Sequence, residues 1–192
     1  YKHWNKLPLS RQLAFIDLIR RSMERHQFPA DGRDLVLAML TQHFPNGSSA
    51  INQALAPLLI KLTPHTAVPQ TIALLDADID QQDGLFYLYH LRHARAGWTP
   101  DLRRTFFRIL GTYETFLGGR GLPLAFKNIR REALETLTAE EKKQYAGFIS
   151  QKPLLPPMPD LTGRGQVRQW KVSDFEGKLG FDALERNLAN GR

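Results

Sequence analysis

The 192-residue sequence predicts an all-α protein, built as a HEAT-like α-solenoid or a compact stack of helical hairpins. Apolar residues recur at the 3.6-residue period of helices, and capping and stop residues separate successive segments at short intervals. No segment alternates apolar and polar residues between hairpin turns, so no sheet is expected. Successive short helices with short connections favour antiparallel pairs, which we place at 10–44, 50–77, 80–117 and 122–150.

The N-terminal half carries four apolar stripes with helical spacing. Ser10 and Asp31 are suitable N-caps for the first two helices, and Phe28-Pro29 and Pro45-Asn46-Gly47 are expected to end them. Pro57 lies inside the third stripe and predicts a kink or a late helix start. The fourth helix is expected to be short. The apolar positions of the four stripes are Leu13, Ile16, Ile19 and Met23; Leu35, Met39 and Leu40; Ile51, Leu55, Leu58, Leu59 and Leu62; and Val68, Ile72 and Leu75.

Four further helices are expected before residue 150. The fifth runs from about Gln81 until Gly97 stops it, and Thr99-Pro100 places an N-cap and a first-turn proline at the start of the sixth. The seventh follows a glycine-rich loop at 118–121. Thr138 and Glu141 have the spacing of a capping box, which opens the last helix. The apolar positions are Leu102, Phe106, Ile109, Leu110 and Tyr113; Leu124, Ile129, Ala133 and Leu137, with Phe126 nearby; and Tyr145, Phe148 and Ile149.

Three regions follow from this pattern: a helical-repeat domain at 1–150, a Pro/Gly-rich extended linker at 151–169, and short helices at 170–192 that lead into a following domain. Leu154, Leu155 and Met158 would be exposed in a free linker, so we expect the linker to lie on the helical body. The absence of an initiator Met and an ending within an amphipathic helix predict a segment of a longer protein.

Composition excludes several classes of site. The sequence has no cysteine, so these residues supply no disulfide, thiol nucleophile, iron–sulfur ligand, Cys-type zinc site or haem c thioether. No apolar run reaches the roughly 18 to 20 residues of a membrane span. The first residues also lack the apolar core of a signal peptide.

The net charge of +7 is concentrated in one band, since residues 92–132 carry nine basic and three acidic side chains. Such a band attracts an acidic protein partner or nucleic acid, or is a solvated helix face. We favour partner docking over nucleic acid, because no helix-turn-helix spacing is present and Phe106 and Phe107 have the spacing of core residues. The candidate docking residues are Arg103, Arg104, Arg108, Lys127, Arg130 and Arg131.

Three patterns could carry chemistry, and each is incomplete. His90 and His93 have the i, i+3 spacing of metal ligands, but only Asp83 stands near as a third. The aspartates at 76, 78, 80 and 83 lack the glycine and glutamate of a calcium loop, so we interpret them as helix caps. The loop at 118–121 could hold a phosphate at a helix N-terminus, but no strand precedes it and no Walker lysine follows. We therefore predict no catalytic, cofactor or metal site in this segment.

Several short stretches between about 40 and 192 together carry a family resemblance. They are Leu91-Arg92, Gly97-Trp98-Thr99-Pro100, Leu102-Arg103-Arg104, Phe106-Phe107, Gly118-Gly119, Phe126, Lys127 to Arg130, Ala133 to Leu137, Trp170-Lys171-Val172 and Asn187 to Arg192. In this order they resemble the PVC-type haem-binding CxxCH proteins. These combine a dehydrogenase-like β-propeller, HEAT-like helical repeats and a C-terminal cytochrome c.

The resemblance implies a non-catalytic scaffold that positions a dehydrogenase-like domain relative to a cytochrome c module. It implies that haem c is held by a module after Arg192, that the partners are neighbouring domains, and that the protein is periplasmic or secreted. Within the scaffold, Gly97 would stop one helix, Trp98 would fill the corner, and Thr99-Pro100 would start the next helix. The alternative is a basic helical-repeat module that binds nucleic acid or an acidic protein partner.

Overall fold

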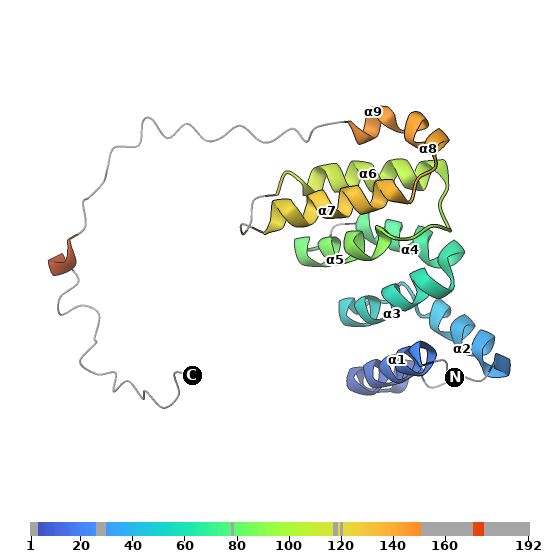
Figure 1. Ribbon diagram of the computed structural model, residues 1–192. Coiled ribbons are helices and arrows are strands. Elements are labelled where there is room, and N and C mark those ends of the chain that lie inside the picture. Colours follow the sequence, from blue (N-terminus) through green and yellow to red (C-terminus); the bar gives the residue numbers. More distant parts are fainter. Residues whose placement is uncertain are drawn as a thin grey trace. The chain divides into compact units, whose positions relative to one another are not determined.

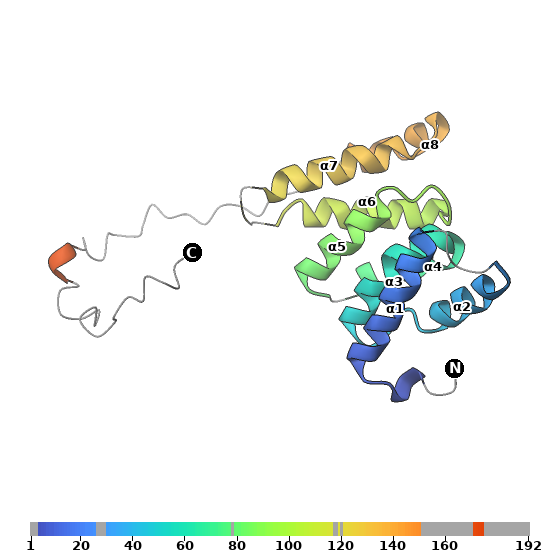
Figure 2. The same ribbon diagram turned by 60° about the horizontal axis from the view of Figure 1, so that its bottom comes forward.

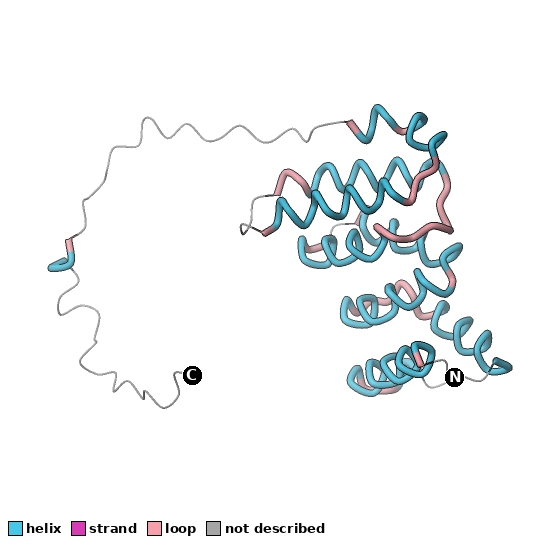
Figure 3. The backbone as a smooth tube through the Cα atoms, in the orientation of Figure 1, coloured by secondary structure: helices cyan, strands magenta, loops and turns pink. Residues whose placement is uncertain are grey.

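The computed structural model describes residues 4–25, 30–77, 79–116, 119, 121–150 and 171–174 (Figure 1). Within these residues the chain is all-helical and has no strand, as Figure 3 shows, which confirms the predicted fold class. Residues 1–155 form one compact unit and residues 156–192 a second. The linker predicted at 151–169 lies outside the described residues, and so does the region at 170–192 except for 171–174. These include the 3₁₀ helix Val172–Asp174.

The first unit begins with a 3₁₀ turn at Trp4–Lys6, and helices follow in close succession. The described helices are α1 (Leu9–Glu24), α2 (Ala30–Gln42), α3 (Ser49–Leu62), α4 (Pro64–Leu75), α5 (Gln81–Leu91), α6 (Pro100–Tyr113), α7 (Leu122–Glu135), α8 (Ala139–Gln144) and α9 (Ala146–Ile149).

These helices stack as successive hairpins in two layers. The first helices of the pairs contact one another in order, α1 with α3, α3 with α5 and α5 with α7 (Figures 1 and 2). In the second layer α4 contacts α6, and α6 contacts α9. Most helices are therefore held by a neighbour in sequence or by the equivalent helix of the next pair, an arrangement compatible with a helical-repeat protein.

The core runs between the layers, with α3 at its centre. Leu55 and Leu59 of α3 are fully buried, as are Leu88 of α5 and Phe106 and Leu110 of α6. Each such side chain contributes about 1.5 to 3 kcal/mol through the removal of apolar surface from water. The burial of these stripes is the main reason that the repeats remain stacked.

Two helix starts differ from the sequence prediction. Pro8, not Ser10, is the N-cap of α1, and the buried Gln12 side chain ties the preceding turn by donating to the carbonyls of Trp4 (2.9 Å) and Leu7 (3.1 Å). Helix α2 begins at Ala30, so Asp31 lies inside its first turn.

Three further boundaries in the middle and at the end of the domain are corrected. Helix α3 begins at Ser49 and runs through Pro57, so the predicted late start is wrong. Helix α5 ends at Leu91, six residues before Gly97, and a loop follows. The last predicted helix is divided into α8 and α9 at Tyr145, whose buried ring (2% exposed) packs into the core.

Three residues assigned to apolar stripes are exposed instead: Leu35, Leu124 and, at 38%, Phe148. Leu35 is 66% exposed while its neighbour Leu37 is buried, and Leu124 is 60% exposed while Phe126 is buried. The remaining predicted positions of these two helices are buried, so each stripe is only narrower than predicted, because neighbouring helices cover part of it. No described helix is both long and apolar enough to cross a membrane.

Candidate docking groove between α5 and α7

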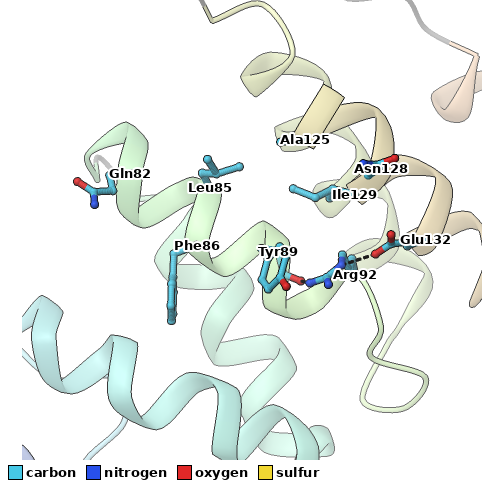
Figure 4. Close-up of a pocket in the computed structure, with 9 residues that line it drawn as sticks. All are labelled: Gln82, Leu85, Phe86, Tyr89, Arg92, Ala125, Asn128, Ile129 and Glu132. Atoms are coloured by element: carbon cyan, nitrogen blue, oxygen red, sulfur yellow. Dashed lines mark hydrogen bonds and ion pairs between the residues drawn. The ribbon is translucent and has the colours of Figure 1, made fainter. Parts of the chain in front are cut away.

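An open groove of about 640 Å³ lies between the first helices of two successive hairpins, α5 and α7 (Figure 4). Its walls combine aliphatic and aromatic side chains with two carboxamides and one ion pair. The lining residues are Gln82, Leu85, Phe86 and Tyr89 of α5, its C-cap residue Arg92, and Ala125, Asn128, Ile129 and Glu132 of α7.

The two walls are built from equivalent positions of the repeat. Four lining positions of α5 recur in α7 with the same spacing of 43 residues. The corresponding pairs are Gln82 and Ala125, Leu85 and Asn128, Phe86 and Ile129, and Tyr89 and Glu132. A period of about 40 to 47 residues is typical of two-helix HEAT and armadillo repeats. The groove is therefore a product of the repeat geometry.

The carboxamides of Gln82 and Asn128 are exposed at the groove, and one lies on each wall. A carboxamide both donates and accepts hydrogen bonds, so it matches the polar groups of a peptide backbone. Between them, Leu85 and Phe86 are half-buried and Ile129 is 2% exposed, which leaves an apolar strip along the bottom. Apolar walls with a few placed polar groups are typical of binding sites.

The other end of the groove is closed by the ion pair of Arg92 and Glu132, which joins α5 to α7 (Figure 4). Both side chains are mostly buried, at 13% and 20% exposed. The hydrogen bond from Arg92, followed by the charges of Arg92, His93 and Arg131, lowers the pKa of the Glu132 carboxyl against the opposing effect of burial. His93 Nε2 lies 3.3 Å from Glu132 Oε2. This end of the groove is thus fixed and charged.

Tyr89 is the most exposed aromatic side chain of the groove, at 49%. The guanidinium carbon of Arg92 lies 3.4 Å from the centroid of its ring, and Arg92 also donates to the backbone carbonyl of Tyr89. A cation held over one face of the ring restrains the ring and leaves the rest of it available for contact. An exposed, restrained tyrosine is a typical anchor at a protein interface.

The structure places the six candidate docking cations in different environments. Arg103 is 2% exposed, so it cannot present its charge to a partner. Its guanidinium donates to Thr136 Oγ1 (3.2 Å) and lies 4.1 Å from the centroid of the Trp98 ring. Burial lowers the pKa of Arg103 to about 10, against the raising effects of Glu141 and Tyr145. Arg103 therefore belongs to the core.

Four of the remaining five cations are engaged in ion pairs within the domain. Arg130 holds Glu114 with two hydrogen bonds, of 2.6 Å and 2.7 Å. The other pairs are Arg104 with Asp101, Arg108 with Asp76, and Arg131 with Glu132 and Glu135. Lys127 is exposed, and within the described part of the chain it makes no ion pair. Four of the six candidate docking cations are thus paired with carboxylates of the domain.

The loop at 97–100 forms a packed corner between α5 and α6. Gly97 has a φ of +82°, and a Cβ at this position would lie 2.1 Å from the Pro64 carbonyl oxygen, so the loop requires glycine. Trp98 donates from Nε1 to the Ala94 carbonyl (2.7 Å). As the sequence predicts, Thr99 is the N-cap of α6 and Pro100 its first residue.

The residues considered for metal or phosphate binding have other contacts. The ring of His90 contacts that of Phe86, with the centroids 4.5 Å apart and the planes tilted by 57°, whereas His93 faces Glu132. Asp80 caps α5, and the buried Asp83 accepts hydrogen bonds from Ser49 and Gln53. In the described ranges no three His, Asp or Glu side chains could together hold a metal ion. Of the loop at 118–121, Gly118 and Arg120 lie outside the described residues.

Sequence reasoning missed the groove, although a signal for it was present. The positions 82, 85, 86 and 89 have the i, i+3, i+4, i+7 spacing of one helix face, and the positions 125, 128, 129 and 132 repeat it. Of these eight positions only Ile129 was assigned to an apolar stripe, because spacing alone does not distinguish a buried face from a groove wall. No known protein-family model, curated protein or solved structure with which the chain was compared matches it.

Proposed function

We propose that this chain is a non-catalytic helical-repeat scaffold that binds an extended segment of a protein partner in the groove between α5 and α7. The observation that carries the proposal is the groove itself, with equivalent positions of two repeats as its walls. Helical-repeat proteins use the surfaces between successive repeats to bind extended ligands.

The chemistry of the groove supports a peptide as the ligand. The apolar strip of Leu85, Phe86 and Ile129 accepts apolar side chains, while Gln82 and Asn128 can hydrogen-bond to the peptide backbone. Because the Arg92–Glu132 pair already holds the two helices together, the partner meets a preformed surface and little free energy is lost in ordering it.

The ion pairs of the basic band favour a protein partner over nucleic acid, which is the alternative function. Arg104, Arg108, Arg130 and Arg131 each have an acidic partner. A phosphate would have to compete with those carboxylates, so the gain from counterion release on binding would be reduced. The band thus offers fewer available cations than its composition indicates.

The family resemblance extends the proposal to the whole protein. The scaffold would then hold a dehydrogenase-like β-propeller at a fixed distance from a cytochrome c module carrying haem c, in a periplasmic or secreted protein. Stacked helix pairs suit this role, because each pair is fixed by its neighbours. The sequence of the full-length protein tests this extension, which requires a CxxCH motif beyond the helical repeats.

The groove is tested by selecting peptides from a displayed random library on the full 192-residue chain. The binding of selected peptides is then measured on the Ala125→Trp variant, in which the new indole fills the groove beside Asn128. We expect selected peptides to bind the wild-type chain with micromolar affinity. Their affinity for the variant is expected to be at least about tenfold lower, the equivalent of about 1.4 kcal/mol.

The control for this test is Leu18→Trp, which places the same indole at an exposed position of α1 outside the groove. Its affinity for the peptides is expected to match that of the wild type. An equal loss of peptide affinity in both variants would contradict the groove as the docking site. An unchanged affinity in Ala125→Trp would contradict it as well. Tight binding of single-stranded DNA at physiological salt would favour the alternative function.

A further inference from the structure

A second concave site lies at the other end of the domain, where α1, α2 and α3 meet. The pocket has a volume of about 340 Å³ and shares no residue with the groove between α5 and α7. It is lined by Arg20, Met23 and Glu24 of α1, Arg33 of α2, and Pro57, Leu58, Lys61 and Leu62 of α3.

The pocket has an apolar floor. Leu58 is 6% exposed, while Met23 and Leu62 are partly buried and pack against the core. Pro57 completes the floor with its ring, which gives this residue a surface role in the middle of α3. The floor is therefore suited to a single aliphatic side chain.

The charges around this floor are not balanced. Arg20 lies between Asp17 and Glu24, at 2.6 Å and 2.8 Å, so its charge is neutralised within α1. Arg33 and Lys61 are exposed, and neither makes an ion pair in the part of the chain that the structure describes. Two available cations on α2 and α3 thus stand at the rim of an apolar pocket.

The sequence shows the same charge imbalance when residues 1–91 are divided at the start of α4. Residues 1–91 carry eight basic and eight acidic side chains and look neutral. However, all eight basic residues and only four acidic ones precede α4, whereas residues 63–91 carry four aspartates and no basic side chain. The end of the domain formed by α1 to α3 is therefore basic, and this field attracts an acidic ligand.

We propose that this pocket binds an acidic segment of a protein partner, which inserts one aliphatic side chain onto the floor and pairs its carboxylates with Arg33 and Lys61. Charge complementarity selects the acidic partner, and the concave apolar floor favours a peptide over nucleic acid or a membrane. A phosphate backbone supplies no side chain to fill the floor, and a bilayer surface does not enter a pocket of this size.

The test uses the full 192-residue chain and a fluorescein-labelled peptide, Gly-Asp-Glu-Asp-Leu-Asp-Glu-Gly, with fluorescence anisotropy at 0.15 M salt. We expect saturable binding that weakens at least about tenfold in the double variant Arg33→Glu/Lys61→Glu. The matched control is Arg95→Glu/Lys127→Glu, which reverses the same two residue types at exposed positions of the basic band. That control is expected to weaken binding less than about threefold, through the net charge alone.

A second pair of peptides separates the pocket from general charge attraction. Replacing the central leucine of the peptide with serine is expected to weaken binding at least about fivefold, because the apolar floor then stays unfilled. Equal affinity for both peptides, or equal losses in the two double variants, would overturn the proposal. A lack of peptide binding would also overturn the proposal, and this includes the case in which phosphatidylglycerol vesicles or single-stranded DNA bind instead. Because the pocket and the groove share no residue, either result leaves the test of the groove unaffected.

Discussion

Arg130 of α7 holds Glu114, the C-cap residue of α6, with two hydrogen bonds: Nε to Oε1 at 2.6 Å, and a terminal guanidinium nitrogen to Oε2 at 2.7 Å. The same guanidinium donates to the carbonyl of Ile149 at the end of α9 (3.1 Å). The Arg130 side chain thus links α7 to the ends of α6 and α9. Both partners are mostly buried, at 18% and 15% exposed, so solvent screens the pair only in part.

The first prediction concerns this pair. We expect Arg130→Met and Glu114→Gln each to lower the free energy of unfolding by about 2 kcal/mol, since each leaves a mostly buried charge without its partner. In the double variant the free energy of unfolding is expected to fall by less than the sum of the two single decreases, because no unpaired charge remains. Urea unfolding of the four proteins measures the coupling. Strictly additive losses would contradict a direct interaction.

The second prediction concerns the corner at Gly97. We expect Gly97→Ala to cost at least about 3 kcal/mol, because it combines backbone strain at a positive φ with a clash against the Pro64 carbonyl. Gly111 of α6 is the control. A Cβ there meets no atom within 4 Å, so Gly111→Ala is expected to stabilise the helix by up to about 1 kcal/mol. Thermal unfolding of both variants checks the opposite signs.

The third prediction separates Arg103 from the other basic residues. Its buried guanidinium has one hydrogen bond to Thr136 and an Nε without a partner among the described residues. We expect Arg103→Met to leave stability unchanged or raise it by about 1 kcal/mol, because it removes a desolvated charge and keeps the packing against Trp98. Arg103→Ala is expected to cost about 2 to 3 kcal/mol through the cavity it leaves.

Arg104→Met is the exposed control for these variants and is expected to change stability by less than about 0.5 kcal/mol. Chemical denaturation measures all three. A loss of several kcal/mol in Arg103→Met would show that the buried charge is fully compensated by its surroundings.

The fourth prediction concerns pH. Burial, followed by the charge of Arg92, lowers the pKa of His90 below its usual 6.5. Below about pH 6.5 the unfolded chain therefore binds a proton that folded His90 resists, and stability falls as the pH decreases. We expect His90→Gln to reduce this decline between pH 7 and pH 5, and the exposed-site control His65→Gln to reduce it less. Equal pH profiles for the wild type and His90→Gln would refute the assignment.

Local features were predictable where neighbouring residues alone define them. Thr99 caps α6 and Pro100 begins it, and Thr138 and Glu141 form the capping box of α8, because each cap is closed within one helical turn. The all-helical fold and the short connections between successive helices followed equally from helical periodicity and from the capping and stop residues. Two helix ends were predicted wrongly: α1 is capped by Pro8 rather than Ser10, and α5 ends at Leu91 rather than at Gly97. The turns beside them are held by Gln12, which donates to the Trp4 carbonyl, and by Trp98, which donates to the Ala94 carbonyl. Helical periodicity does not show which carbonyl such a side chain will bond.

The sequence by itself determined that this protein is all-helical in its described part, that short connections join its successive helices, and that most of its net positive charge lies between residues 92 and 132. Only the tertiary structure decided which charges remain available. Arg103 is buried and Arg130 is bound to Glu114, whereas Arg33 and Lys61 lie beside an apolar floor and form no ion pair with any residue that the structure describes. Helical periodicity fixes which residues share a face. Whether that face becomes core, groove wall or open surface depends on neighbours distant in the sequence, and their packing sets the burial and pairing of every charge.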